Sequence, residues 1–240
     1  MGVAQKPSRS KARRGNRPDA LIVFFKVPEK GHVKTRLAQK YGDDEALYIY
    51  YVLMSYTIFN VRRYMDIAKN LETIMLYSSK KPKVAKEKGA VNGKYRFVAQ
   101  VKGDMGQRFE AAFDDVLKGG PRKAIIIGTD CIGLTKEVLG AAFGALDKHD
   151  VVIGPAEDGG YYLIGFKDRS LANKLFKDVL WSTDKVLLQT MKNIKSAGLT
   201  VYKLPKLFDV DTPKDWARAR KECAFVNVIY ELAQHVEGGA

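Results

Sequence analysis

Carboxylates that follow apolar runs are the first candidates for chemistry in this sequence. Asp130 comes after the run 124–128, and Asp209 and Asp211 come shortly after the run 199–204. Carboxylate oxygens are preferred ligands of Mg²⁺ and Mn²⁺, which bridge them to substrate phosphates. The alternating positions of the later pair could direct both side chains to one face. Asp130 is therefore a candidate metal ligand; the structural alternative is an Asp that holds a turn or caps a helix.

A basic loop after the first apolar run has residues suited to binding phosphate groups. It contains Lys26, Gly31 and the segment Lys34-Thr35-Arg36. Backbone amides and fixed cations in such a loop both favour an anion. The GxxxxGK[ST] spacing of P-loop proteins is absent from the sequence. The loop is therefore either a phosphate site or simply a basic turn.

The stretch GPAEDGGYYLIGF, residues 154–166, places an acidic pair and two glycines between two apolar runs. The runs predict a β-hairpin, and Glu157 and Asp158 fall at its turn. Gly159 and Gly160 can adopt positive φ, which suits a sharp turn and lets a substrate approach the backbone closely. The hairpin turn is thus a second place where a carboxylate could meet a substrate.

The order of apolar runs and helical repeats predicts the elements that position these residues. We expect strands at 21–25, 71–77, 95–99, 124–128, 150–154, 161–166 and 199–204, and helices at 43–69, 105–117, 135–146, 170–177 and 184–196. Alternating strands and helices are typical of a mostly parallel sheet, which the hairpin makes mixed. The predicted fold class is α/β, a single-domain three-layer α/β/α sandwich. In such sheets ligands bind beyond the carboxyl ends of the strands, where the candidate residues lie.

Composition and charge exclude several classes of protein. The chain has 240 residues, of which 46% are hydrophobic, enough to fill a sizeable core. Six of its lysines and arginines lie in residues 1–18, which contain no acid. We expect a disordered basic tail over 1–18 and a folded domain over 19–240. The net charge of +14 comes largely from that tail and from residues 79–94, and no helix-turn-helix or RNP pattern predicts specific nucleic-acid binding.

The sequence also predicts the compartment. It contains no secretory signal and no apolar run of about 18 residues, so no transmembrane segment is expected. Cys131 and Cys223 lack CxxC spacing, which fits a reducing compartment. We therefore expect a cytoplasmic protein. The oligomeric state is left open, with a homodimer as one option.

The assembled motifs resemble one known family. The sequence resembles the uncharacterised transferase family DUF2064, also called selenodomain-associated transferase 1, of the GT-A (nucleotide-diphospho-sugar transferase) superfamily. The resemblance covers nearly the whole chain after residue 19, in order. It is carried by FFKVPEKGHVKTRLAQKYG (24–42), GDMGQRFEAAF (103–113), IIIGTDCIGLT (125–135), VVIGPAEDGGYYLIGF (151–166), LFKDVLWST (175–183) and LFDVDTPKDW (207–216).

The resemblance implies a GT-A fold and a nucleotide-dependent transferase that uses Mg²⁺ or Mn²⁺. Asp130 resembles the metal-binding DxD-type position of the superfamily, reduced here to a single Asp. The DxDTPxD segment resembles a late motif that completes the metal site, which implies Asp211 first and Asp209 second. The KTR segment resembles the loop that holds the nucleotide phosphates, which implies Lys34 and Arg36.

Four further residues have both a structural and a functional interpretation. Asp104 and Arg108, at an expected helix start, either pair with each other or favour the helix dipole, or else border the nucleotide as part of the family pattern. Tyr161 alternates with Tyr162, so that one faces the core and the other could face an acceptor pocket. Trp181 is either a packed anchor or a platform at that pocket.

Three functions remain open from the sequence. A glycosyltransferase would move a sugar from a nucleotide sugar to a small acceptor, with Asp158 as general base and Glu157 behind it. A nucleotidyltransferase would couple a nucleoside triphosphate to a small phosphorylated metabolite. The layout resembles phospholactate and molybdenum-cofactor guanylyltransferases, but the sequence lacks the GxGxR loop of sugar-nucleotide pyrophosphorylases. The third option is a non-catalytic nucleotide-binding protein. We expect the first.

Overall fold

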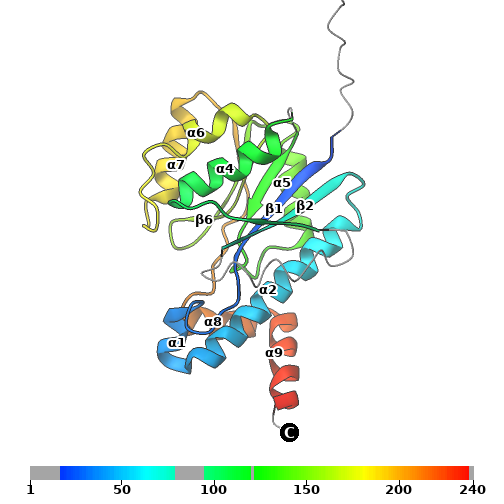
Figure 1. Ribbon diagram of the computed structural model, residues 1–240, viewed down its shortest axis with the longest axis vertical. Helices are drawn as coiled ribbons and strands as arrows, with labels where there is room; N and C mark the ends of the chain where they lie inside the picture. The colour runs from blue at the N-terminus through cyan, green and yellow to red at the C-terminus, as the bar shows by residue number, and fades with distance from the viewer. Residues whose placement is uncertain (1–16, 79–94, 120–121, 238–240) are drawn as a thin grey trace, which may run out of the picture.

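The computed structural model describes residues 17–78, 95–119 and 122–237 (Figure 1). Most of the tail predicted at 1–18 therefore lies outside the described residues, as does the basic stretch 79–94. The division into a tail and one domain stays a prediction. Among the described helices, none combines the length and the apolar composition needed to cross a membrane.

Within the described residues, the strands form one seven-stranded mixed sheet in the order β3-β2-β1-β4-β6-β5-β7. The strands are β1 Asp19–Lys26, β2 Leu71–Ser78, β3 Tyr95–Ala99, β4 Ala124–Ile127, β5 Val151–Pro155, β6 Tyr161–Phe166 and β7 Val201–Lys203. β6 runs antiparallel to β4 and to β5, and the other neighbours are parallel. The predicted mostly parallel sheet with a central hairpin is confirmed.

Helices cover both faces of the sheet, which confirms the three-layer prediction (Figure 1). They are α1 Thr35–Tyr41, α2 Asp43–Met65, α4 Met105–Leu117, α5 Lys136–Ala145, α6 Ala172–Leu175, α7 Val186–Ser196, α8 Pro213–Glu222 and α9 Ala224–Glu237, with a short 3₁₀ turn at Arg169–Leu171. α4, α6 and α7 pack on one face, and α2 and α5 on the other.

The alternation of side chains along β1 divides the core. Ile22 and its alternate neighbours join the cluster under α4, whereas Leu21 and Val23 join the cluster under α2 and α5. All three are 1% exposed or less, as expected for a strand covered on both faces. A third cluster, around Leu37 and Trp216, packs α1, α8 and α9 against the N-terminal half of α2.

Side-chain caps mark the starts of α4, α5 and α8. Thr135 caps α5, and Thr212 with Asp215 forms a capping box at the start of α8, with Pro213 in its first turn. α2 ends at Met65, four residues before its predicted end, because residues 66–70 form the turn that leads to β2. The short helix α1, which buries only Leu37 fully, and α9 were not predicted.

Candidate functional site

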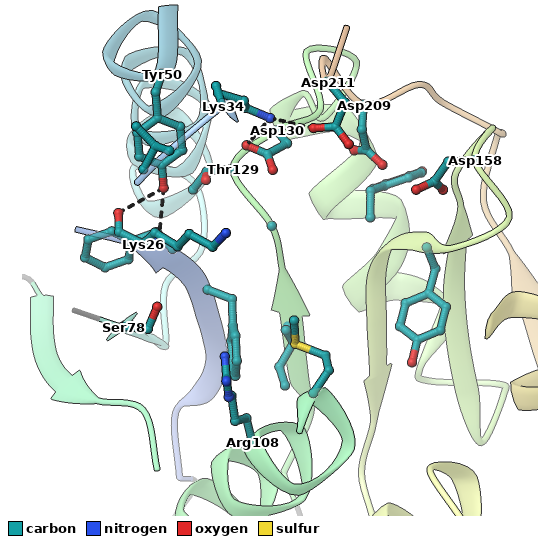
Figure 2. A pocket seen from close by; sticks show the side chains of 18 of the residues that line it. Lys26, Lys34, Tyr50, Ser78, Arg108, Thr129, Asp130, Asp158, Asp209 and Asp211 are labelled. Carbon is teal, nitrogen blue, oxygen red and sulfur yellow. Dashed lines mark hydrogen bonds and ion pairs between the residues drawn. The ribbon is translucent and has the colours of Figure 1, made fainter. Parts of the chain in front are cut away.

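A pocket of about 410 Å³ opens at the carboxyl ends of β1 and β4 (Figure 2). It brings together many of the predicted site residues, which come from distant parts of the chain. These are Lys26, Lys34, Thr35, Arg36, Arg108, Asp130, Asp158, Tyr161, Asp209 and Asp211. The position agrees with the rule that open α/β sheets bind ligands beyond the carboxyl ends of their strands.

The segment after β7 reaches the pocket by pairing with the loop after β4. Val210 N–H donates to the Asp130 carbonyl at 2.9 Å, and Asp209 forms an antiparallel bridge with Cys131. Earlier in the segment, Leu207 forms a parallel bridge with Ala156. The backbone between β7 and α8 is therefore held both by the loop after β4 and by the residue that follows β5. This pairing brings the late acidic motif beside the carboxylate that follows β4.

Lys34 lies between two of the predicted metal ligands. Its Nζ is 2.9 Å from Oδ1 of Asp130 and 3.0 Å from Oδ1 of Asp211 (Figure 2). The Lys34 side chain is 4% exposed, whereas the two carboxylates are 43% and 40% exposed. Burial lowers the pKa of Lys34, but the two carboxylates outweigh it and raise that pKa above its ordinary value. Lys34 is therefore a charged ammonium held by two anions.

The backbone of Lys34 aims this side chain. The residue has φ 47° and ψ 44°, a left-handed conformation that is uncommon for a residue with a Cβ. Its carbonyl accepts hydrogen bonds from the N–H groups of Leu37 and Ala38 at 2.9 and 3.0 Å. A residue keeps such a sparsely populated conformation only where the surrounding structure holds it. The start of α1 therefore fixes the backbone of Lys34 and the direction of its side chain.

Asp209 and Asp211 lie two residues apart but have opposite electrostatic environments. Burial, followed by the nearby charges of Asp130 and Asp158, raises the pKa of Asp209 to about 7. Burial also acts on Asp211, but Lys34 and then Arg36 hold its pKa below the usual range. Among the described residues, Asp209 has no ion pair, and only the more distant charge of Lys34 favours its ionised form.

The acidic residues of the pocket fit a divalent metal ion whose coordination shell is completed by substrate phosphates. Oδ1 of Asp130 is buried, and the Lys34 ammonium is its one partner among the described residues. No three acidic, cysteine or histidine side chains of the described chain are grouped closely enough to cage a metal. Mg²⁺ is usually held by one or two carboxylates and the substrate phosphates. Asp130 and Asp211 are the pair that matches this pattern.

The opposite side of the pocket is basic. Lys26 points into the cavity from the end of β1, and Arg108 enters from α4 (Figure 2). Tyr50 fixes the end of β1: its hydroxyl accepts from Lys26 N–H at 3.0 Å and donates to the Lys26 carbonyl at 2.9 Å. Burial raises the pKa of Tyr50 to about 12, so the hydroxyl keeps the proton it donates.

Sequence reasoning missed several residues that line the pocket or hold it in place. Four lining residues, Tyr50, Ser78, Gln100 and Thr129, had no predicted site role. Gln100 donates from Nε2 to the carbonyls of Phe25 and Leu76. A signal existed for Ser78 and Gln100, because each follows a predicted strand at its carboxyl end.

Asp158 faces the pocket from the hairpin turn. Its Oδ1 accepts from Gly160 N–H at 2.8 Å, and Gly159 has φ 89°, the sharp turn that the two glycines predict. A Cβ on Gly159 would lie 2.2 Å from the Asp184 carbonyl oxygen, so the close packing of this turn requires glycine. The turn holds Asp158 close enough to raise the pKa of Asp209.

Other predicted site residues lie outside the pocket. Glu157 points to Arg218, whose Nη1 donates to both carboxylate oxygens at 3.1 and 3.0 Å. Asp104 caps α4 in a capping box with Gln107. In the described structure its carboxylate forms no ion pair with Arg108, whose Nε donates to the Gly103 carbonyl. Gly31, Gly159 and Gly160 serve turns, and Trp181 packs against Phe109 and Phe176. Their predicted substrate roles stay predictions.

The motifs and the fold have matches among known proteins. The family model described as "Uncharacterized protein conserved in bacteria (DUF2064)" matches residues 64–183, half of the chain. The chain belongs to the DUF2064 family. This confirms the family resemblance and the α/β fold class. A search of curated proteins found no match.

Solved structures extend the DUF2064 comparison. A "putative nucleotide-diphospho-sugar transferase" from Desulfovibrio desulfuricans G20 superposes with a TM-score of 0.79 at 29% identity, covering 92% of this chain and 95% of that one. The inositol-1-phosphate CTP transferase from T. maritima gives 0.53 at 15% identity, covering 90% and 98%. Rv0371C from Mycobacterium tuberculosis H37Rv, in complex with manganese, gives 0.53 at 15% identity, covering 85% and 99%. The last two show a shared fold.

Proposed function

We propose that this protein is a metal-dependent glycosyltransferase that moves a sugar from a nucleoside diphosphate sugar to a small acceptor. One observation carries the proposal: a single pocket at the carboxyl ends of β1 and β4 opposes cations to carboxylates. Lys26 and Arg108 lie on one side, and Asp130 and Asp211 lie around Lys34 on the other. The family, and the likeness to the Desulfovibrio protein, support a nucleotide-dependent transferase.

The cations provide the binding energy for the diphosphate. Lys26, Arg36 and Arg108 would contact its oxygens and stabilise the charge that grows on the leaving group as the sugar departs. A divalent ion held by Asp130 and Asp211 would supply Lewis-acid neutralisation of the same charge. Fixed charges in a partly buried site need little reorganisation, which is why this arrangement favours a departing anion.

Asp158 is the residue we assign to proton transfer. The bond from the anomeric carbon to the diphosphate oxygen breaks, a bond to an acceptor hydroxyl oxygen forms, and Asp158 takes the hydroxyl proton. The turn hydrogen bond from Gly160 N–H fixes one carboxylate oxygen and leaves Oδ2 for the acceptor. The acceptor pocket on this account lies next to the hairpin turn, with Tyr161 at its wall.

Nucleotidyl transfer is the second candidate. The shared fold with an inositol-1-phosphate CTP transferase is the observation that favours it. The same cations would then hold a triphosphate, a substrate phosphate would attack the α-phosphorus, and pyrophosphate would leave. The two candidates therefore differ in the donor that the pocket binds, which is a nucleoside diphosphate sugar in the first and a nucleoside triphosphate in the second.

A thermal-shift screen with Mg²⁺ or Mn²⁺ separates the candidates. We expect nucleoside diphosphate sugars to stabilise the protein in a metal-dependent way, and Asp130→Ala to lose that dependence. Stabilisation by triphosphates alone would support nucleotidyl transfer instead. If ligands bind but no nucleotide sugar is consumed with any acceptor tested, a non-catalytic binding protein is the better account.

A further inference from the structure

Lys34 occupies the position of a cation between two carboxylates. Its Nζ contacts Oδ1 of Asp130 and Oδ1 of Asp211 at 2.9 and 3.0 Å, and its side chain is almost fully buried. The two contacted oxygens belong to the pair that fits a divalent ion. The ammonium and a divalent ion would therefore use the same oxygen atoms and cannot both be bound there.

Asp130 depends on this ammonium more than Asp211 does. Oδ1 of Asp130 is buried, and its one partner among the described residues is the Lys34 ammonium. Arg36 provides Asp211 with a second cation at 3.6 Å, whereas the described ion pairs give Asp130 only Lys34. A buried carboxylate oxygen without a partner is costly. If Lys34 turns away, another cation must take its place at Asp130.

We propose that Lys34 is an exchangeable counter-ion: it leaves Asp130 and Asp211 for a substrate phosphate when a divalent metal ion replaces it. The inference rests on the proposed function for the phosphate. Metal binding releases Lys34 to contact the phosphate, and the departure of Lys34 frees the carboxylates for the metal. Metal and nucleotide therefore bind cooperatively. The exchange keeps a cation at Asp130 at every stage, so the pocket never holds the bare carboxylate pair.

The local structure confines the movement to the side chain. The Lys34 carbonyl is held by Leu37 and Ala38, and the backbone stays at the start of α1. Nζ ends a flexible four-carbon stem, and Lys34 itself lines the pocket in which the phosphates would lie. Rotation about the side-chain bonds is sufficient to carry the ammonium from the carboxylates into the pocket.

The competing account is a permanent structural ion pair. In that case Lys34 would keep its carboxylates in every state, and a divalent ion would bind elsewhere or not at all. The two accounts differ in the metal affinity of the free protein and in the state of the Lys34 ammonium after loading.

The first test uses Mn²⁺ alone, without nucleotide. Electron paramagnetic resonance titration measures Mn²⁺ affinity for the wild type, Lys34→Met and Lys26→Met. Lys26 is the matched control, because the same substitution removes one charge from the same pocket without breaking an ion pair with Asp130 or Asp211 in the described structure. We expect Lys34→Met to bind Mn²⁺ about tenfold more tightly than Lys26→Met. Equal affinities, or weaker binding by Lys34→Met, would overturn the proposal.

The second test observes the wild-type lysine, so that it does not depend on how well a variant folds. Lysine ammonium signals are recorded by ¹H–¹⁵N NMR, and the Lys34 signal is assigned by its loss in Lys34→Arg. We expect it to shift when Mg²⁺ and uridine or guanosine diphosphate are added together. An unchanged Lys34 signal while other pocket signals show saturation would mean a permanent ion pair. If neither diphosphate binds but the Mn²⁺ result holds, the exchange with metal survives and the proposed function fails.

Discussion

Two groups of ion pairs in this protein use the same kinds of residue in different surroundings. In the pocket, Lys34 joins Asp130 and Asp211, and its side chain is 4% exposed. On the surface, Arg218 joins Glu157 and Glu222, and its side chain is 41% exposed. Arg218 also lies 3.8 Å from the centre of the Phe208 ring. The geometry of both groups is good, since the shortest nitrogen–oxygen distance in each pair is 3.0 Å or less.

The comparison teaches that burial, rather than distance, decides what such a pair does. Water screens the charges around Arg218, so its pair with Glu157 mainly adds a contact between the hairpin turn and α8, and its pair with Glu222 lies within α8. Around Lys34 the screening is weaker, and removal of one charge leaves the others uncompensated. The raised pKa of Asp209 shows this effect, because burial is its largest cause and the charges of Asp130 and Asp158 add to it. Four substitutions probe this difference.

The largest effect is expected for Lys34→Met, which removes the cation paired with Asp130 and leaves Asp211 with only Arg36 among the described ion pairs. We expect the free energy of unfolding to fall by about 3 kcal/mol when metal is removed with a chelator, because uncompensated charges remain. Urea denaturation of wild type and variant measures the difference. Mn²⁺ should restore part of the loss. A variant as stable as wild type in chelator would show that the pocket is as well screened as the surface.

Asp158 and Glu157 are neighbours in sequence, one in each region. We expect Asp158→Asn to lower turnover about 100-fold or more, as for loss of a general base, with nucleotide affinity within a few-fold of wild type. Glu157→Gln, its matched control, should change turnover little, because Glu157 contacts Arg218 instead. Steady-state kinetics and calorimetric titration separate the two effects. The reverse ranking would move the catalytic carboxylate to Glu157.

Asp209→Asn should stabilise the protein. The pKa of Asp209 is 3.8 in the unfolded chain and about 7 in the folded one, so folded wild type binds the extra proton between these values. Wild type therefore loses stability as pH rises from about 4 to 7, by on the order of 3 kcal/mol from this group, and the Asn variant lacks this contribution. Chemical denaturation across this range, in chelator, compares them. Parallel curves would mean that Asp209 titrates normally.

Arg218→Met is expected to have the smallest effect. Its pairs are exposed, and the methionine side chain keeps some contact with Phe208. The melting temperature should fall much less than for Lys34→Met, and salt should reduce the difference further. Differential scanning calorimetry at low and high salt checks this. A loss comparable to that of Lys34→Met would remove the contrast between the two regions.

The sequence predicted the frame of the site better than its contacts. Asp130, Asp209 and Asp211 could be found because each follows an apolar run that forms or precedes a strand. The bridge between Asp209 and Cys131 joins residues far apart in sequence, so only the folded chain shows which carboxylates meet. The same holds for Glu157, whose partner Arg218 is 61 residues away. Lys34 was predicted as a phosphate ligand. Its pairing with Asp130 and Asp211 depends on a left-handed backbone conformation that the local sequence does not predict.

The central claim is that Asp130 holds a metal ion against a nucleotide's phosphates. The most direct measurement is calorimetric titration of wild type and Asp130→Ala with uridine and guanosine diphosphate, each with and without Mn²⁺. We predict that Mn²⁺ strengthens binding of at least one diphosphate to the wild type and has no effect on the variant. An equal gain from Mn²⁺ in both proteins would contradict the account.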